Sequence, residues 1–121
     1  MNLKGAMAER AASNYLIRKN YTLLDYNYTS QFGEIDLIFR DGNDLVFVEV
    51  KARDVRDHAL PREYVDVRKQ RKMILTAERY IKQKKLHLQP RFDIVEVFCE
   101  KGKIKSVNHL EKAFDLDYNI K

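Results

Sequence analysis

The chain has 121 residues, of which 45% are hydrophobic and 34% are charged, and its formal net charge is +5. This length suits one folded domain, residues 1–121, and the hydrophobic content excludes a disordered chain. No apolar run approaches the roughly 20 residues of a membrane-spanning helix. Glu9 and Arg10 interrupt the segment where a secretion signal would be apolar. We therefore expect a cytoplasmic protein that does not enter a membrane.

The first half of the chain predicts a helix followed by three strands. Apolar residues over 5–19 recur at the spacing of one helical face, and aromatic and β-branched residues over 21–29 indicate a strand. Two further strand-like runs, 34–40 and 45–53, flank Asp41-Gly42-Asn43-Asp44. Because glycine and asparagine tolerate a positive φ, these two runs are expected to form a hairpin.

The second half of the chain adds a helix and one or two strands. A polar loop over 54–63 leads into a helix from residue 64 or 65 to 84, whose apolar residues again share one face. Strands are expected over 92–100 and about 103–109, and the apolar residues of the tail indicate a short helical turn: Leu110, Ala113, Phe114 and Leu116. Because a helix joins the hairpin to the next strand, the sheet must be mixed and the fold class is α/β.

The positive charge is concentrated on the second predicted helix. Between residues 68 and 85 the only acid is Glu78, and the basic residues are Arg68, Lys69, Arg71, Lys72, Arg79, Lys82, Lys84 and Lys85. Such a run is either a solvated helix face or a surface for a polyanion such as nucleic acid. Charge alone favours neither interpretation.

The hairpin carries the residues with the most distinctive chemistry. Strand alternation places Glu34 and Asp36 on one face of the first strand, and Glu49 and Lys51 on one face of the second. A turn centred on residues 42–43 sets Asp36 opposite Glu49, and Glu34 opposite Lys51. Two acids side by side in otherwise apolar strands repel each other and are costly to bury. A shared proton, a salt bridge to Lys51 or a divalent cation would relieve that cost.

A divalent cation at Asp36 and Glu49 would equip this hairpin for phosphodiester hydrolysis. Mg²⁺ and Mn²⁺ bind one or two carboxylates together with water and phosphate oxygens. Such an ion activates water and polarises a phosphate, while Lys51 could stabilise the charge that develops. The alternative is a structural salt bridge between Glu34 and Lys51, with the other two acids solvated.

The same residues resemble a known nuclease signature. Asp36, followed by Glu49-Val50-Lys51 in the next strand, is similar to the PD-(D/E)xK motif of restriction-endonuclease-like nucleases, although Ile35 stands where that motif has proline. The segments GEIDLI and FVEVKAR resemble the YraN-like bacterial family more closely. The resemblance extends over residues 5–98 and includes Gly5, Glu9, Ala12, Tyr15, Leu16, Pro61, Val67, Lys69, Ala77, Tyr80, Arg91, Phe92 and Asp93.

This resemblance implies a restriction-endonuclease-like αβββαβ core, with a central mixed sheet flanked by helices, and it agrees with the element order above. It also implies a nuclease that acts on DNA with Mg²⁺ or Mn²⁺. In the similar archaeal-type Holliday-junction resolvases a helix glutamate completes the metal site, and by position that residue would be Glu9. Without the resemblance, Glu9 is interpreted as a solvated helix acid.

Further residues are candidates for supporting roles. Contacts with the nucleic-acid backbone, which would hold it without reading the base sequence, are expected from Arg53, Arg68, Lys69 and Lys72. Glu34 is either a further carboxylate of the site or the partner of Lys51. Asp93 is expected to join the sheet to a helix through hydrogen bonds.

The expected function is metal-dependent hydrolysis of DNA, with branched DNA as one candidate substrate. Asp36, Glu49 and Lys51 would carry the reaction, and a homodimer would bring two sites to two strands. Two alternatives remain open. One is a nucleic-acid-binding protein that has the nuclease-like fold but no turnover. The other is a structural or adaptor protein whose acids form a surface salt-bridge cluster.

Overall fold

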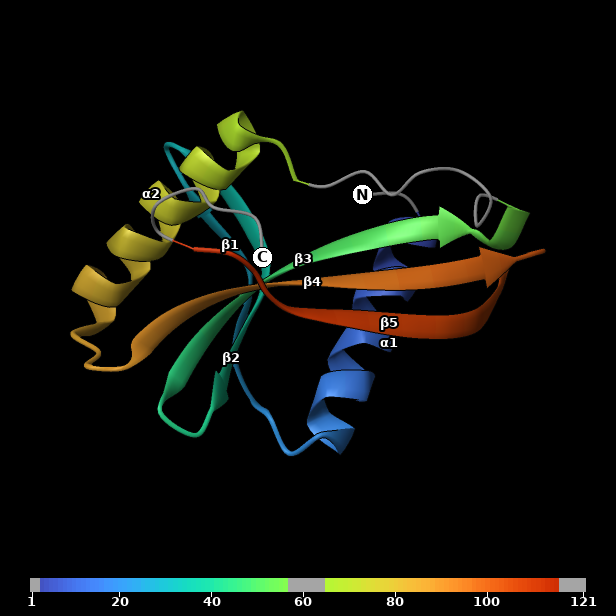
Figure 1. Ribbon diagram of the computed structural model, residues 1–121, viewed down its shortest axis with the longest axis horizontal. Helices are drawn as coiled ribbons and strands as arrows, with labels where there is room; N and C mark the ends of the chain where they lie inside the picture. Colours follow the sequence, from blue (N-terminus) through green and yellow to red (C-terminus); the bar gives the residue numbers. More distant parts are fainter. Residues whose placement is uncertain (1–2, 57–64, 116–121) are drawn as a thin grey trace.

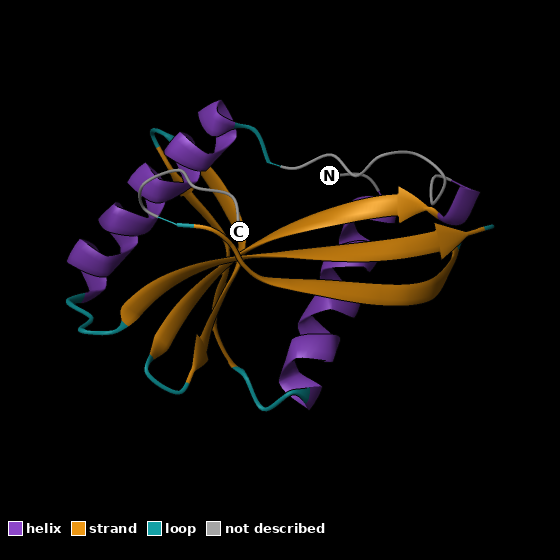
Figure 2. Ribbon diagram, viewed as in Figure 1, coloured by secondary structure: helices purple, strands orange, loops and turns teal. Residues whose placement is uncertain are grey.

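The computed structural model describes residues 3–56 and 65–115, which form a five-stranded sheet with a helix on each face (Figure 1 and Figure 2). The elements are α1 (Leu3–Arg18), β1 (Thr22–Ser30), β2 (Gly33–Asp41), β3 (Asp44–Asp54), α2 (Val67–Lys84), β4 (Gln89–Glu100) and β5 (Lys103–Phe114). The strands lie in chain order, and all neighbours are antiparallel except β3 and β4, which are parallel. The predicted mixed sheet and α/β class are confirmed, because α2 connects the two parallel strands.

The centre of the sheet is buried on both faces, and strand alternation divides it between two cores. On β3, Leu45 and Phe47 belong to the core beneath α2, whereas Val46 and Val48 belong to the core beneath α1. All four side chains are fully buried. The two cores anchor the helices on opposite faces of the sheet.

The second helix begins later than the sequence predicts. Asp66 accepts a hydrogen bond from the backbone N–H of Lys69 at 2.8 Å, which makes it the N-cap of α2. The predicted start at residue 64 and residues 57–63 of the predicted polar loop lie outside the described residues, whereas Asp54 of that loop is the last residue of β3. Neither of the two helices that the structure describes is long and apolar enough to cross a membrane.

The predicted helical turn at the C-terminal end is wrong, because residues 110–114 continue β5. Lys112 has a positive φ of 52°, and the register with β4 shifts nearby. This irregularity lets Leu110, Ala113 and Phe114 pack against one core, which imitates the spacing of a helical face. Phe114 pairs with Phe92, and their rings stack with centroids 4.9 Å apart. Leu116 lies outside the described residues.

Candidate metal and nucleic-acid site

The predicted acidic pair lies where β2 and β3 stop pairing. The register of this hairpin is the predicted one, but its last pair is Leu37 with Val48. Beyond it, the carboxylate of Asp36 accepts a hydrogen bond from the backbone N–H of Val50 at 2.8 Å. The Asp36 carboxylate therefore takes the place of the backbone carbonyl that would accept this hydrogen bond if the two strands still paired. The expectation that the ladder continues through Asp36 opposite Glu49 and Glu34 opposite Lys51 is wrong.

Strand alternation on β2 is also interrupted at this point. Ile35 and Ile38 both belong to the core beneath α2, although they are three residues apart, whereas Leu37 belongs to the core beneath α1. The neighbouring strand explains the interruption, because Asn27 of β1 has a left-handed φ of 48° opposite position 36. The site is therefore built on a local distortion that simple alternation does not predict.

Three carboxyl groups at this position are held in an environment that favours their neutral forms. Burial raises the pKa of Asp36 above its ordinary value, and the charge of Glu34 adds to the rise. Glu49 is buried, and burial followed by the charge of Asp36 raises its pKa. Burial also raises the pKa of Glu9, with contributions from Asp36 and Glu34. Glu9 of α1 therefore lies close enough to the hairpin acids for their charges to act on it.

Two lysines offset part of this negative charge. Lys51 lowers the pKa values of Asp36 and Glu49, so it lies near both. The Lys69 Nζ, a predicted phosphate contact, lies 3.5 Å from Oε2 of Glu49 and forms an ion pair with it. Among the described residues of the cluster, four carboxylates therefore face two ammonium groups: Glu9, Glu34, Asp36 and Glu49 against Lys51 and Lys69.

The donor set suits a small, hard cation that keeps other ligands. Within residues 3–56 and 65–115, no three Asp, Glu, His or Cys side chains are close enough together to hold a metal ion alone. Mg²⁺ needs fewer, because it uses one or two carboxylates and fills its shell with water and phosphate oxygens. A cation already stands at Glu49 in the form of the Lys69 ammonium. In type and number, the carboxylates of Asp36 and Glu49 match the ligands that Mg²⁺ or Mn²⁺ takes from a protein.

One residue of this site, Asn27, is not among the site residues predicted from the sequence. The side-chain amide of Asn27 bridges two acids when its nitrogen faces them, the orientation that satisfies its surroundings: it lies 3.1 Å from Oε1 of Glu9 and 3.2 Å from Oε1 of Glu34. The only sequence signal is an asparagine between two tyrosines within a strand. Asparagine is among the few residues that tolerate a left-handed backbone.

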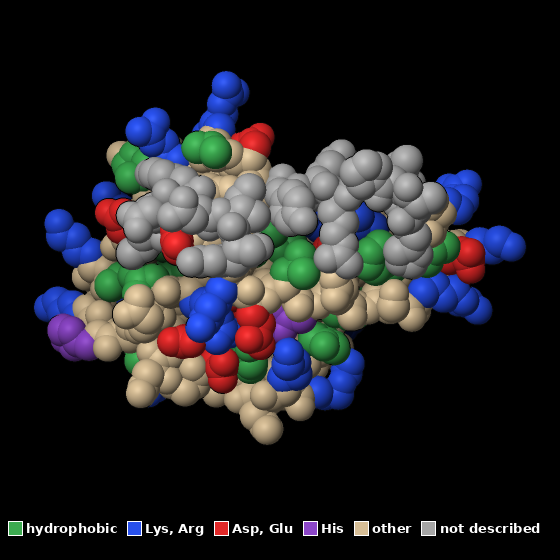
Figure 3. Space-filling model, viewed as in Figure 1, with side chains coloured by type: hydrophobic (Ala, Val, Ile, Leu, Met, Phe, Trp, Pro, Cys, Tyr) green, Lys and Arg blue, Asp and Glu red, His purple; other side chains and the backbone are tan. Residues whose placement is uncertain are grey.

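The basic residues of α2 lie beside this cluster. Arg68 and Lys72 are exposed, and a Cβ atom added to Gly33 would lie 3.7 Å from the Lys72 Cβ, so α2 crosses the start of β2 next to Glu34. Figure 3 shows lysine and arginine side chains gathered over α2 and, separately, at the far ends of β3, β4 and β5. The two predicted contacts Arg68 and Lys72 are therefore accessible to a large polyanion.

Arg53 differs from the other predicted backbone contacts. Its Nε lies 3.1 Å from Oε2 of Glu96, a buried acid of β4 that also accepts a hydrogen bond from Asn108. Arg53 thereby neutralises a buried carboxylate. A structural role accounts for its position.

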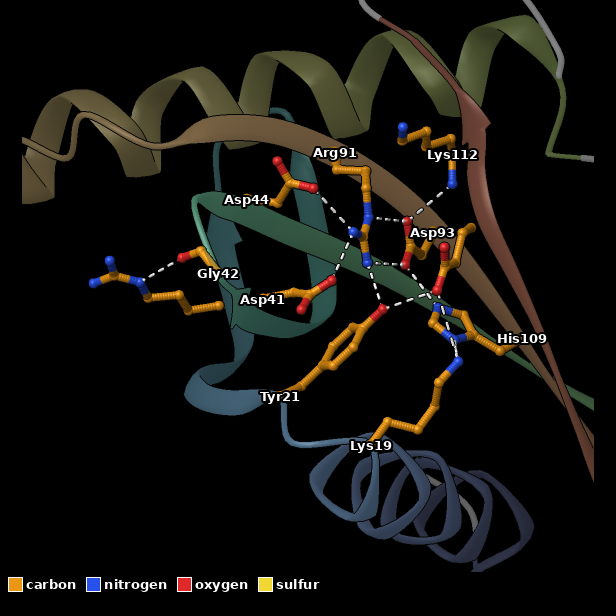
Figure 4. A network of polar contacts seen from close by, with 11 residues as sticks. Lys19, Tyr21, Asp41, Gly42, Asp44, Arg91, Asp93, His109 and Lys112 are labelled. Atoms are coloured by element: carbon orange, nitrogen blue, oxygen red, sulfur yellow. Dashed lines mark hydrogen bonds and ion pairs between the residues drawn. The ribbon is translucent and has the colours of Figure 1, made fainter.

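We call the point beyond Leu37 and Val48, where β2 and β3 stop pairing, the fork of β2 and β3. A second cluster of charged residues lies at the other end of this hairpin (Figure 4). Arg91 donates to both carboxylate oxygens of Asp93 at 3.0 Å, and it also donates to Asp41 and Asp44 of the β2–β3 turn. Asp93 further contacts His109 at 2.7 Å and accepts from the backbone N–H of Lys112. The expectation that Asp93 joins the sheet to a helix is wrong in its partners, because these contacts join strands.

Comparison with known proteins covers the whole site. The model of the Uncharacterised protein family UPF0102 matches residues 8–97. A UPF0102 protein of Caldanaerobacter subterraneus is 43% identical over 113 residues, which cover 91% of this chain and 93% of the relative. UPF0102 proteins of Pelotomaculum thermopropionicum and Persephonella marina are 40% and 37% identical and cover 93% and 96% of this chain, and 95% and 97% of their own lengths. The chain therefore belongs to UPF0102, the family of YraN-like proteins that its motifs resemble.

Proposed function

We propose that this protein is a metal-dependent nuclease that hydrolyses phosphodiester bonds in DNA. One observation carries the proposal: Asp36 and Glu49 are withdrawn from water at the fork of β2 and β3, in a cluster where acids outnumber lysines. Holding such acids ionised is unfavourable unless a further cation is present. One divalent ion would supply the two positive charges that the described cluster lacks.

The residues of the cluster would then have different roles in the reaction. Asp36 and Glu49 would hold Mg²⁺ or Mn²⁺, and Glu9 is a further candidate ligand. When bound, the ion would polarise the phosphodiester and make water a stronger nucleophile. Lys51, which lies near both acids, would stabilise the negative charge that develops on the phosphate.

The DNA backbone would lie along α2. Arg68 and Lys72 are exposed there, and Lys69 would exchange its contact with Glu49 for a phosphate once the metal is bound. Contacts of this kind neutralise phosphates and carry no base preference. The proposed substrate is therefore DNA chosen by its shape, branched DNA included.

A cleavage panel tests the proposal. Branched, nicked and single-stranded DNA are incubated with and without Mn²⁺, using the wild type, Lys51→Ala and the matched surface control Lys105→Ala. We expect Mn²⁺-dependent cutting that falls by about 10² to 10³ in Lys51→Ala and is unchanged in the control. Equal cutting by all three proteins would identify a contaminating nuclease and overturn the proposal.

The contact between Lys69 and Glu49 favours a second candidate, a nucleic-acid-binding protein without turnover, because a lysine already neutralises one of the two acids. DNA binding that weakens steeply with salt, without any Mn²⁺-dependent cutting, would support this candidate.

A DNA partner would place the protein in the cytoplasm, and a homodimer would present two sites to two strands. The edge strand β1 exposes Leu23, Leu24 and Tyr26, which supports a surface for a second copy. Sedimentation velocity of the wild type and of Tyr26→Ser would test it, because a dimer through this edge should dissociate in the variant.

A further inference from the structure

Asn27 has an unusual backbone conformation in the middle of a strand. Its φ is 48°, although its neighbours Tyr26 and Tyr28 pair regularly with Leu37 and Ile35 on β2. Left-handed backbone is unfavourable for residues other than glycine and persists only where surrounding contacts maintain it. At this position the contacts include those of the side-chain amide and a hydrogen bond of 3.4 Å from the Thr29 hydroxyl to the Asn27 backbone carbonyl.

The amide of Asn27 joins two acids from different layers of the fold. With its nitrogen facing them, it donates to Glu9 of α1 at 3.1 Å and to Glu34 of β2 at 3.2 Å. An amide nitrogen carries two hydrogens, so both carboxylates can be served at once. Hydrogen bonds to ionised acceptors are stronger than those between neutral groups.

Glu9 and Glu34 carry like charges, so a group that donates to both is needed to hold them side by side. Besides burial, the charge of Asp36 and then the charge of Glu34 raise the pKa of Glu9, so the negative charges of these acids repel each other. The hydrogen bonds from Asn27 offset the repulsion. They also hold the side chain of Glu9, which comes from α1, beside the acids of the hairpin.

We infer that Asn27 is a positioning residue that holds Glu9 and Glu34 next to Asp36, so that the acids are already in place when a divalent cation binds. This inference rests on the proposed function. Asn27 touches neither metal nor substrate in this arrangement; it acts on the metal site through the two glutamates. Partners that orient ligands in this way commonly change metal affinity by 10- to 100-fold when they are removed.

Asn27→Gly tests the inference, because glycine keeps the left-handed backbone and removes only the amide. The matched control is Asn20→Gly, since Asn20 has a φ of 69° but lies exposed at the end of α1. Mn²⁺ affinity is measured by titration calorimetry, and thermal unfolding without metal checks that each variant folds. We expect about 10-fold or greater loss of Mn²⁺ affinity in Asn27→Gly and wild-type affinity in the control.

A double-mutant cycle separates positioning from a general effect on the fold. In the Glu9→Ala/Glu34→Ala background, Asn27→Gly should cause no further loss of Mn²⁺ affinity, because the amide no longer has a side-chain acceptor to hold at either position. An equal loss in both backgrounds, or unchanged affinity in Asn27→Gly alone, would overturn this inference only. Failure of the wild type to bind Mn²⁺ would overturn the proposed function as well.

Discussion

Asp93 and Asp36 are both aspartates in inner strands of one sheet, yet their pKa values move in opposite directions. Burial acts on both. At Asp93 the hydrogen bonds from His109 and Arg91 outweigh burial and lower the pKa. At Asp36 burial dominates, and the Val50 N–H and the nearby lysines compensate only in part, so the pKa rises.

The difference separates a structural cluster from a candidate site. Arg91 joins β4 to the turn between β2 and β3, because it forms ion pairs with Asp41, Asp44 and Asp93 (Figure 4). The cluster at the fork of β2 and β3 has more carboxylates than cations. A buried acid is therefore informative about function only when its compensation is known.

Breaking the paired cluster should have the largest effect. Asp93→Ala leaves Arg91 and His109 buried without their main partner, so the free energy of unfolding should fall by about 3 to 5 kcal/mol. Urea unfolding without divalent ions measures the change. The control is Glu78→Ala on the exposed face of α2, which should stay within about 0.5 kcal/mol of the wild type. A comparable effect in both variants would contradict the assigned role of Asp93.

Adding a divalent cation to the cluster of Asp36 and Glu49, where carboxylates outnumber cations, should have the next largest effect. At a free Mn²⁺ concentration about 100 times the dissociation constant, binding should stabilise the wild type by about 2.7 kcal/mol. Asp36→Asn should lose this stabilisation, and without metal it should be at least as stable as the wild type, because asparagine can still accept from the Val50 N–H. Thermal unfolding with and without Mn²⁺ measures both. Equal stabilisation of the variant would show that the ion binds elsewhere.

The two clusters should also respond oppositely to pH in the absence of metal. The raised pKa of Glu49 means that the folded protein holds its proton longer than the unfolded chain, so stability falls as pH rises from the ordinary value of 4.5 through the raised one. The lowered pKa of Asp93 acts in reverse: its contribution is present above the ordinary value of 3.8 and is lost as pH falls through the lowered one.

Glu49→Gln isolates the first of these effects. It should remove part of the loss of stability with rising pH, so the stability of the variant should rise relative to the wild type between about pH 4 and pH 7. Urea unfolding across this range measures the difference. Parallel stability curves for the two proteins would contradict the raised pKa of Glu49.

The smallest effect should distinguish the two kinds of basic residue. Lys72→Ala should reduce the salt dependence of DNA binding by about 0.9 in the slope of log affinity against log salt, the loss expected for one phosphate contact. Arg53→Ala should leave the slope unchanged but lower stability, because Glu96 loses its ion pair. Fluorescence anisotropy at several salt concentrations measures the slopes. If Arg53→Ala changed the slope and Lys72→Ala did not, their roles would be exchanged.

The sequence by itself determined the element order, the α/β class and the hairpin register. These depend on contacts between near neighbours: the turn at Gly42 and Asn43 sets which residues pair, and apolar periodicity marks the helices. The candidates Asp36, Glu49 and Lys51 follow from the same local pattern. The helix acid Glu9 came from the resemblance, since nothing local links it to the hairpin.

Only the tertiary structure decided how the charges of these residues are balanced. The fork at Asp36, the contact of Lys69 with Glu49 and the bridge through Asn27 join residues that are far apart in the chain. The same holds for Arg91, whose partners come from three strands and the segment before β1. Burial and the balance of charges depend on how all the elements pack together, and no local sequence pattern encodes that packing.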